Sequence, residues 1–104
     1  MWALVTNPTE FASMLYLITY DISCNKRRKK VSDLLEGYGQ RVQYSVFECE
    51  LTAEQYQELR QRLRQRVQQD GDSVRVYPLS GHMLSQVEVW GGVPVVAPPR
   101  SIII

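Results

Sequence analysis

Histidine and cysteine are scarce in this chain of 104 residues, which has His82 alone and two cysteines, Cys24 and Cys49, with no CxxC pair. Structural zinc sites are built from several Cys and His ligands, so a site of that kind is almost excluded. Two thiols without a disulfide framework are typical of a reducing cytosol, and we expect a cytoplasmic location.

The chain also lacks long apolar runs and an excess of charge of one sign. No run reaches the roughly 20 apolar residues that a membrane-spanning helix needs, so we expect no membrane association. The first residues have neither a basic start nor a long apolar core, which argues against a signal peptide. A net charge of +1, with 44% apolar and 22% charged residues, is ordinary for one soluble globular domain.

Positive charge is nevertheless concentrated at two places. Cations at a helix start oppose the helix dipole, so we expect the first run to bind phosphate, with a solvated helix start as the alternative. The second run is weaker evidence, because arginine side chains often lie along apolar surface. The first run is Lys26, Arg27, Arg28, Lys29 and Lys30, and the second is Arg60, Arg62, Arg64 and Arg66.

The stretch Leu15–Asp21 (LYLITYD) organises the chain, because it reads as a buried strand that ends on a carboxylate. The basic run then opens a helix over about 26–38, which Ser23 or Asn25 could cap. Apolar residues at helical spacing place Arg27 and Arg28 on the inward side, beside Asp21. A carboxylate can hold a hard divalent cation, and cations beside it can hold phosphate.

The second half of the chain reads as an extended segment, a helix and further strands. Arg41–Leu51 forms one long strand or two short ones, since no Gly or Pro marks a turn. Thr52 and Gln55 form a capping box for the next helix. Ser73–Leu79 alternates as an edge strand, and 80–86 reads as a loop. Short strand candidates follow at 87–90 and 93–96.

If the extended segment holds two strands, the order is βαββαβ, an α+β ferredoxin-like sandwich with both helices on one face of an antiparallel sheet. We expect this domain to span residues 14–80, with an extra strand at its C-terminal end. Residues 1–13 are expected to be a poorly ordered extension, with a short edge strand at 2–5 as the alternative. Residues 81–104 are expected to pack on a dimer partner, because their apolar end needs cover.

Asp21 is either a metal ligand or a turn residue, because Asp is common at such junctions for capping alone. One carboxylate holds Mg²⁺ poorly. A two-fold axis close to Asp21 would bring two copies together, and two close carboxylates repel unless they are protonated or bind metal. Such a site could activate water for attack on a phosphodiester. Tyr20, Tyr44 and Phe47 are expected to be packing residues.

Four stretches together resemble a known family: LYLITYDI, KRRKKV, YGQRVQYSVFEC and DSVRVYPL. They resemble the small endonuclease-like proteins of CRISPR adaptation, the partners of the CRISPR integrase. The resemblance covers about residues 14–79, and RVQYSVFE at its distance from the strand that ends in Asp is the specific signal. Related toxin-like ribonucleases share the same fold.

The resemblance implies a ferredoxin-like homodimer in which the segment RVQYSVFEC bends into two strands near Tyr44. It implies that Asp21 and its copy in the second subunit hold Mg²⁺ or Mn²⁺, and that Arg28, Arg41 and Phe47 are catalytic-site residues. A strand at 93–96 would pair across the dimer.

Two activities follow from the resemblance. The first is a metal-dependent endonuclease acting on single-stranded RNA or double-stranded DNA in antiviral defence. The second is a non-catalytic, DNA-binding dimer that bridges integrase subunits, with its cations carrying the function. A ferredoxin-like regulatory domain for small ligands is a third reading, and the basic runs argue against it.

Overall fold

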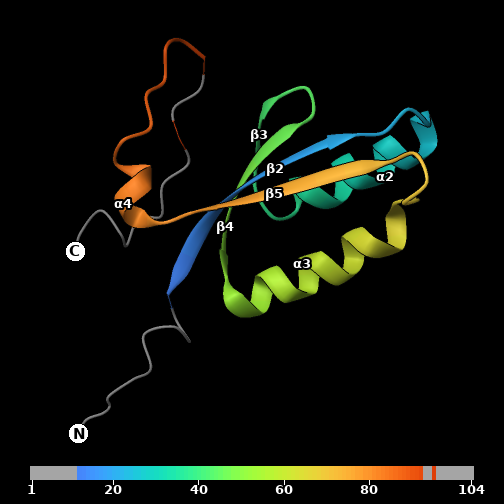
Figure 1. Ribbon diagram of the computed structural model, residues 1–104, viewed down its shortest axis with the longest axis horizontal. Helices are drawn as coiled ribbons and strands as arrows, with labels where there is room; N and C mark the ends of the chain where they lie inside the picture. Colours follow the sequence, from blue (N-terminus) through green and yellow to red (C-terminus); the bar gives the residue numbers. More distant parts are fainter. Residues whose placement is uncertain (1–11, 93–94, 96–104) are drawn as a thin grey trace, which may run out of the picture.

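The computed structural model describes residues 12–92 and 95, and the elements in this part follow the order βαββαβ (Figure 1). The sheet has the strand order β3-β4-β2-β5 with every neighbouring pair antiparallel, so the prediction of a ferredoxin-like α+β fold is confirmed. A short helix follows the last strand. The elements are β2 (Ser13–Asp21), α2 (Asn25–Glu36), β3 (Gln40–Gln43), β4 (Val46–Thr52), α3 (Ala53–Arg66), β5 (Ser73–Leu79) and α4 (Gly81–Leu84).

The extended segment divides into β3 and β4 at a turn over Tyr44 and Ser45, as the family resemblance implied. The pairing register shifts between Arg41 and Gln43, so a bulge disturbs the alternation that a continuous strand would show. Gly39 precedes β3 and packs directly against β4, where a Cβ atom would lie 2.3 Å from the carbonyl oxygen of Glu48. Close packing of the two strands therefore requires glycine at this position.

The core lies between the sheet and the two long helices. Alternate residues of the strands face the helices, and each helix buries the apolar stripe that its sequence predicts. On α3 this stripe begins beside Thr52, whose side chain forms the predicted capping box with Gln55. The buried residues of this core are Ile18, Tyr20, Ile22, Val31, Leu35, Phe47, Cys49, Leu51, Leu59 and Leu63.

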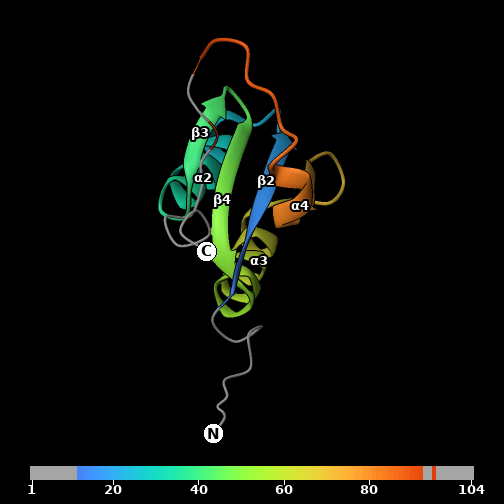
Figure 2. The same cartoon turned by 90° about the vertical axis from the view of Figure 1, so that its left-hand side faces the viewer.

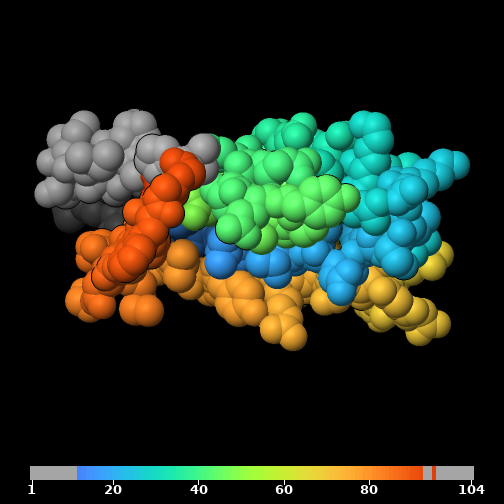
Figure 3. Space-filling view, turned by 90° about the horizontal axis from the view of Figure 1, so that it is seen from above, coloured from blue at the N-terminus to red at the C-terminus, as the bar shows by residue number. Residues whose placement is uncertain are grey.

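The opposite face of the sheet carries no long helix in the described part of the chain. Cross-strand pairs place Leu17 opposite Glu48 and Tyr77, and Thr19 opposite Val46. Residues 87–92 run beside β3 and β4 and line a pocket with them, and Figure 3 shows this orange-red segment next to the green hairpin. We call this side of the sheet the open face.

Three expectations about local structure were wrong. Residues 80–86 contain the helix α4 (Figure 2). Ser80 caps this helix by accepting a hydrogen bond from the Met83 N–H at 3.2 Å. Residues 87–90 form no strand. The N-cap of α2 is Cys24, without a side-chain cap, rather than Ser23 or Asn25.

Other expectations lie outside the described residues. They concern residues 1–11 of the extension expected at 1–13, the edge strand at 2–5, and most of the candidate strand at 93–96. Ser13, the last residue of that expected extension, is the first residue of β2. In the part that is described, β5 is the last strand and no helix is long and apolar enough to span a membrane.

Candidate functional site

Asp21 is the last residue of β2, and it pairs with Ser73 at the start of β5. Its neighbour Tyr20 is buried on the helix side, so the Asp21 side chain lies on the open face, where it is exposed. Within residues 12–92 no hydrogen bond or ion pair engages its carboxylate. The carboxylate is thus free to bind a cation.

The described residues of one chain do not complete a metal site around Asp21. No group of three or more His, Cys, Asp or Glu side chains able to hold a metal ion occurs among the described residues. A metal site with three or more such ligands at Asp21 would therefore need side chains from outside the described residues, such as those of a second chain.

Arg28 holds the turn that follows Asp21. Its Nη1 donates to the carbonyl oxygens of Ile22 at 2.7 Å and Ser23 at 3.3 Å, and its Nη2 donates to the Asn25 side chain. Since Ile22 is also buried, both the backbone and a side chain anchor this turn. The Arg28 guanidinium thereby fixes the direction in which the chain leaves β2.

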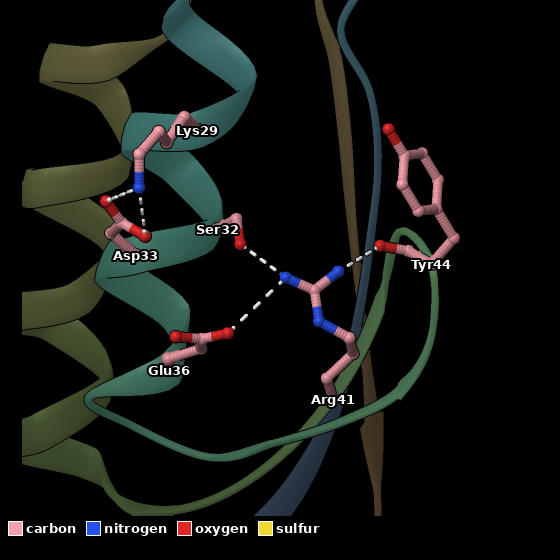
Figure 4. Close-up of polar contacts among 6 residues, drawn as sticks. All are labelled: Lys29, Ser32, Asp33, Glu36, Arg41 and Tyr44. Atoms are coloured by element: carbon pink, nitrogen blue, oxygen red, sulfur yellow. Dashed lines mark hydrogen bonds and ion pairs between the residues drawn. The ribbon is translucent and has the colours of Figure 1, made fainter. Parts of the chain in front are cut away.

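Arg41 lies on β3 and connects that strand to α2, as Figure 4 shows. Its guanidinium donates to the Ser32 hydroxyl and to the Tyr44 carbonyl oxygen, and it lies 3.4 Å from a carboxylate oxygen of Glu36. The guanidinium carbon is 4.9 Å from the centroid of the Phe47 ring, in the geometry of a cation–π contact. Phe47 is fully buried, so its ring packs against the Arg41 guanidinium and presents no surface to a ligand.

A pocket of about 240 Å³ brings Arg28 and Arg41 together on the helix side of the sheet. Asp21 does not line this pocket. The backbone N–H of Tyr20, the neighbour of Asp21, donates to the Ser45 carbonyl oxygen at 3.1 Å, so Asp21 and the pocket lie at the same end of the sheet. The predicted residues thus occupy two faces of the same end. The pocket is lined by Tyr20, Asn25, Arg28, Lys29, Ser32, Arg41 and Tyr44.

Tyr44 is the residue that sequence reasoning assigned wrongly. It was expected to be a packing residue, whereas 71% of it is exposed, while Tyr20 and Phe47 are buried as expected. Its exposure follows from its place in the turn between β3 and β4, which no Gly or Pro marks. Asn25 and Ser32 were missed as pocket residues for a similar reason, because their roles depend on contacts with the arginines.

The cations of the first basic run have different surroundings. Arg27 forms a two-pronged ion pair with Asp72, at 2.8 and 3.1 Å, and Asp72 also accepts the Gln68 N–H at 2.9 Å. These hydrogen bonds lower the pKa of the Asp72 carboxyl, the Arg27 bond most, and the bond to Asp72 raises the pKa of Arg27. Arg27 therefore anchors α2 to the loop before β5 and is not free to bind a ligand.

The lysines of this run remain available to solvent. Lys29 pairs with Asp33 at 3.0 Å, one turn along the helix, and both side chains are largely exposed (Figure 4). Lys26 and Lys30 are exposed and have no hydrogen-bond or ion-pair partner in the described part of the chain. Exposed pairs contribute little to stability, so these three lysines can bind an anion at little cost to the fold.

The two cysteines are in opposite environments. Cys24 is the N-cap of α2, where the backbone N–H groups of Arg27 and Lys26 lower the pKa of its thiol. Cys49 lies in the core on β4, and burial raises the pKa of its thiol to about 11. Neither cysteine forms a disulfide.

Comparisons with known proteins agree on one family. Residues 14–87 match the family model described as CRISPR associated protein Cas2. A Synechocystis sp. protein named CRISPR-associated endoribonuclease Cas2 3 is 59% identical over 90 residues, which cover 86% of this chain and 98% of that protein.

Solved structures give the same result. A hypothetical protein from Thermus thermophilus is 43% identical with a TM-score of 0.72, and the match covers 80% of this chain and 98% of that one. A chain of a partial Cas6-RT-Cas1–Cas2 complex is 32% identical with a TM-score of 0.67, covering 83% of this chain and 94% of that one. The family that the sequence resembles is thus confirmed, and the chain belongs to the CRISPR associated protein Cas2 family.

Proposed function

We propose that this protein is a metal-dependent endonuclease of the CRISPR spacer-acquisition machinery that acts in the cytoplasm as a homodimer. The carboxylate of Asp21, at the end of β2 and without a partner among residues 12–92, carries the proposal. The endoribonuclease name of the Synechocystis relative supports cleavage of single-stranded RNA, and double-stranded DNA is the second substrate to test.

The open face of the sheet supports the dimer. Leu17, Thr19 and Val46 are only half-buried there, and Tyr77 is 42% exposed. A sheet face with apolar side chains is normally covered by another layer, and a second copy would supply that layer. Because Asp21 lies on the same face, a two-fold axis near the end of β2 would bring the two carboxylates together.

The chemistry of this carboxylate fits a hard cation such as Mg²⁺ or Mn²⁺. Mg²⁺ keeps several waters and is usually held by one or two carboxylates, which a pair of Asp21 side chains would provide. When bound, the ion would supply Lewis-acid activation at the phosphodiester. Two close carboxylates would otherwise repel each other, so the pair itself favours a cation.

The chain's own residues position this site. Arg28 fixes the backbone directly after Asp21, and Arg41 holds β3, the β3–β4 turn and α2 together above Phe47. Both guanidinium groups already bind protein acceptors, so we assign them to positioning. Lys29 lies in the same pocket with its ammonium exposed, and we assign it to phosphate contact.

A second function, a DNA-binding dimer that bridges integrase subunits, is favoured by one observation. Lys26 and Lys30 have no partner in the described part of the chain. They belong to α2, in the layer opposite the open face that carries Asp21, so their charge is not devoted to the Asp21 site. The similarity to a chain of a Cas1–Cas2 complex supports this partner class.

The test compares wild type with Asp21→Ala on single-stranded RNA and duplex DNA, from pH 6 to 9, with Mg²⁺ and with Mn²⁺. We expect the variant to lose cleavage of the preferred substrate while sedimentation still reports a dimer. Glu54→Gln, an exposed carboxylate on α3, is the control and should cleave like wild type. Unchanged cleavage by Asp21→Ala would reject the catalytic role.

A further inference from the structure

We propose that Arg75, on β5, binds a phosphate of the RNA strand beside Asp21. The proposal rests on the endonuclease function above and adds to it the residue that receives the substrate's negative charge. Arg28 and Arg41, the arginines that the family resemblance implied for the site, already donate to protein acceptors and line a pocket on the helix side of the sheet. A phosphate that lies against Asp21 therefore needs a cation from the open face.

The strand register places Arg75 close to Asp21. Cross-strand pairing sets Thr19 opposite Arg75, and it sets Asp21 opposite the residue two positions earlier on β5. Val74 and Val76 pack against the core on the helix side, so the Arg75 side chain between them lies on the open face. Arg75 and Asp21 are thus diagonal neighbours on that face. In this relation the side chains are about 7–8 Å apart at their bases, which is within reach of a long side chain.

The Arg75 guanidinium is available to a ligand. The residue is exposed, and no ion pair engages it among the residues that the structure describes. Its Nη1 donates to the Tyr77 hydroxyl at 3.1 Å, a contact between two side chains of the same face that directs the guanidinium along β5. Because a guanidinium has several N–H donors, this single bond leaves others for phosphate oxygens.

Within the four described strands, the open face offers no second cation. The open-face positions of β2, β3 and β4 carry apolar, hydroxyl, amide and carboxylate side chains, among them Gln40, Gln43 and Glu48. Lys29 belongs to α2, in the opposite layer. Among the strand residues, Arg75 is therefore the one that can neutralise charge on a phosphate beside Asp21.

The proposed dimer gives this neighbourhood a second electrostatic role. A two-fold axis near the end of β2 would bring together two copies of Asp21 and, beside them, two copies of Arg75. A nearby guanidinium favours the charged form of a carboxylate, so the arginines would reduce the cost of gathering two acids. The planar fork of a guanidinium also matches two oxygens of one phosphate. Asp21 and Arg75 thus supply a ligand for a cation and a ligand for an anion on one face.

The test measures binding of single-stranded RNA in an Asp21→Ala background with EDTA present, so that the result depends on neither cleavage nor a metal ion. One variant carries Arg75→Gln, and a second carries Arg75→Lys, which keeps the charge. The matched control is Arg62→Gln on α3, in the other layer, where the Glu58 carboxylate lies 3.3 Å from the guanidinium. Urea midpoints and sedimentation would verify that each variant folds and associates like its parent.

We expect Arg75→Gln to reduce the slope of log K against log salt by about 0.7, which is the contribution of one phosphate contact on a single strand. Arg75→Lys and Arg62→Gln should keep the slope of the parent. An unchanged slope in Arg75→Gln, or an equal reduction in Arg62→Gln, would reject the assignment. A dimer lost only in the two Arg75 variants would also overturn it, because the residue would then hold the two copies together.

A cleavage assay with Asp21 restored and Mg²⁺ present gives a second measurement. There Arg75→Gln should lower kcat/KM for single-stranded RNA by about tenfold, the loss expected for one hydrogen-bonded contact to a charged group. The binding assay contains neither Asp21 nor metal, so it decides the role of Arg75 even if Asp21→Ala still cleaves. Cleavage by Asp21→Ala would reject the nuclease function alone.

Discussion

Gly39 offers the sharpest test of the packing that positions β3. A Cβ atom at this residue would lie 2.3 Å from the Glu48 carbonyl oxygen, 2.5 Å from Cys49 Sγ and 2.8 Å from Cys49 Cα. Two of these three atoms belong to the backbone of β4, so no side-chain rotation can relieve the contact. Replacement by alanine must therefore push β3 away from β4.

The expected cost of Gly39→Ala follows from these contacts. Overpacking of a close-packed interior typically costs about 1–3 kcal/mol, and contact with backbone atoms places this substitution near the upper limit. Burial of the added methyl group returns only about 0.8 kcal/mol. We therefore expect the free energy of unfolding to fall by about 2–3 kcal/mol, a large share of the roughly 5–15 kcal/mol that small domains possess.

Urea unfolding followed by circular dichroism measures this loss. With a slope of about 1–3 kcal/mol per molar urea, the midpoint should fall by about 0.7–3 M. Gly71→Ala is the control, because nothing lies within 4 Å of a Cβ atom at that loop position, and its change should stay within about 0.5 kcal/mol. A Gly39→Ala protein that unfolds at the wild-type midpoint would refute the steric argument.

Two further predictions concern titratable groups. At neutral pH an alkylating reagent should modify Cys24 in the folded protein and leave Cys49 unmodified. The reason is that the helix start lowers the pKa of the Cys24 thiol, whereas burial raises the pKa of the Cys49 thiol. Mass spectrometry of digested peptides measures the labelling, and preferential labelling of Cys49 would contradict the prediction. The Asp72 carboxyl has a lowered pKa in the folded state, so between the folded and unfolded pKa values the unfolded state binds more protons. The contribution of the Arg27–Asp72 pair to folding stability is therefore present above this pH window and is lost as the pH falls through it. Thermal unfolding from pH 6 down to pH 3 should therefore show a shallower loss of Tm for Asp72→Asn than for wild type, and parallel curves would contradict this.

Elements with strong local signals could be predicted from the sequence. The strand that ends at Asp21 has an uninterrupted β-forming run, and α3 has both a capping box and a regular apolar stripe. Such signals depend on residues a few positions apart, and the structure forms them where the pattern indicates. The division of the segment after Gly39 into two strands could not be predicted from its pattern alone, because it depends on a bulge and on a turn that contains no Gly or Pro.

The details of the candidate site depend on contacts that sequence spacing does not contain. Arg27 finds Asp72 at a separation of 45 residues, so its neighbour Arg28, and not Arg27, holds the turn after Asp21. Tyr44 is exposed because of its place in a turn, although its residue type favours burial. Periodicity placed both arginines on the inward side of α2, but it could not show which acceptor each would reach.

The antiparallel packing of α2 and α3 has an electrostatic consequence for the basic run. A helix that begins with five cations opposes its own dipole, yet here the carbonyl end of α3, with its partial negative charge, lies close to that beginning. The backbone dipole of α3 thus offsets part of the repulsion, while Arg66 in its last turn adds positive charge beside Lys30. The positive surface is consequently in place before any ligand arrives, so binding needs no ordering of a charged segment.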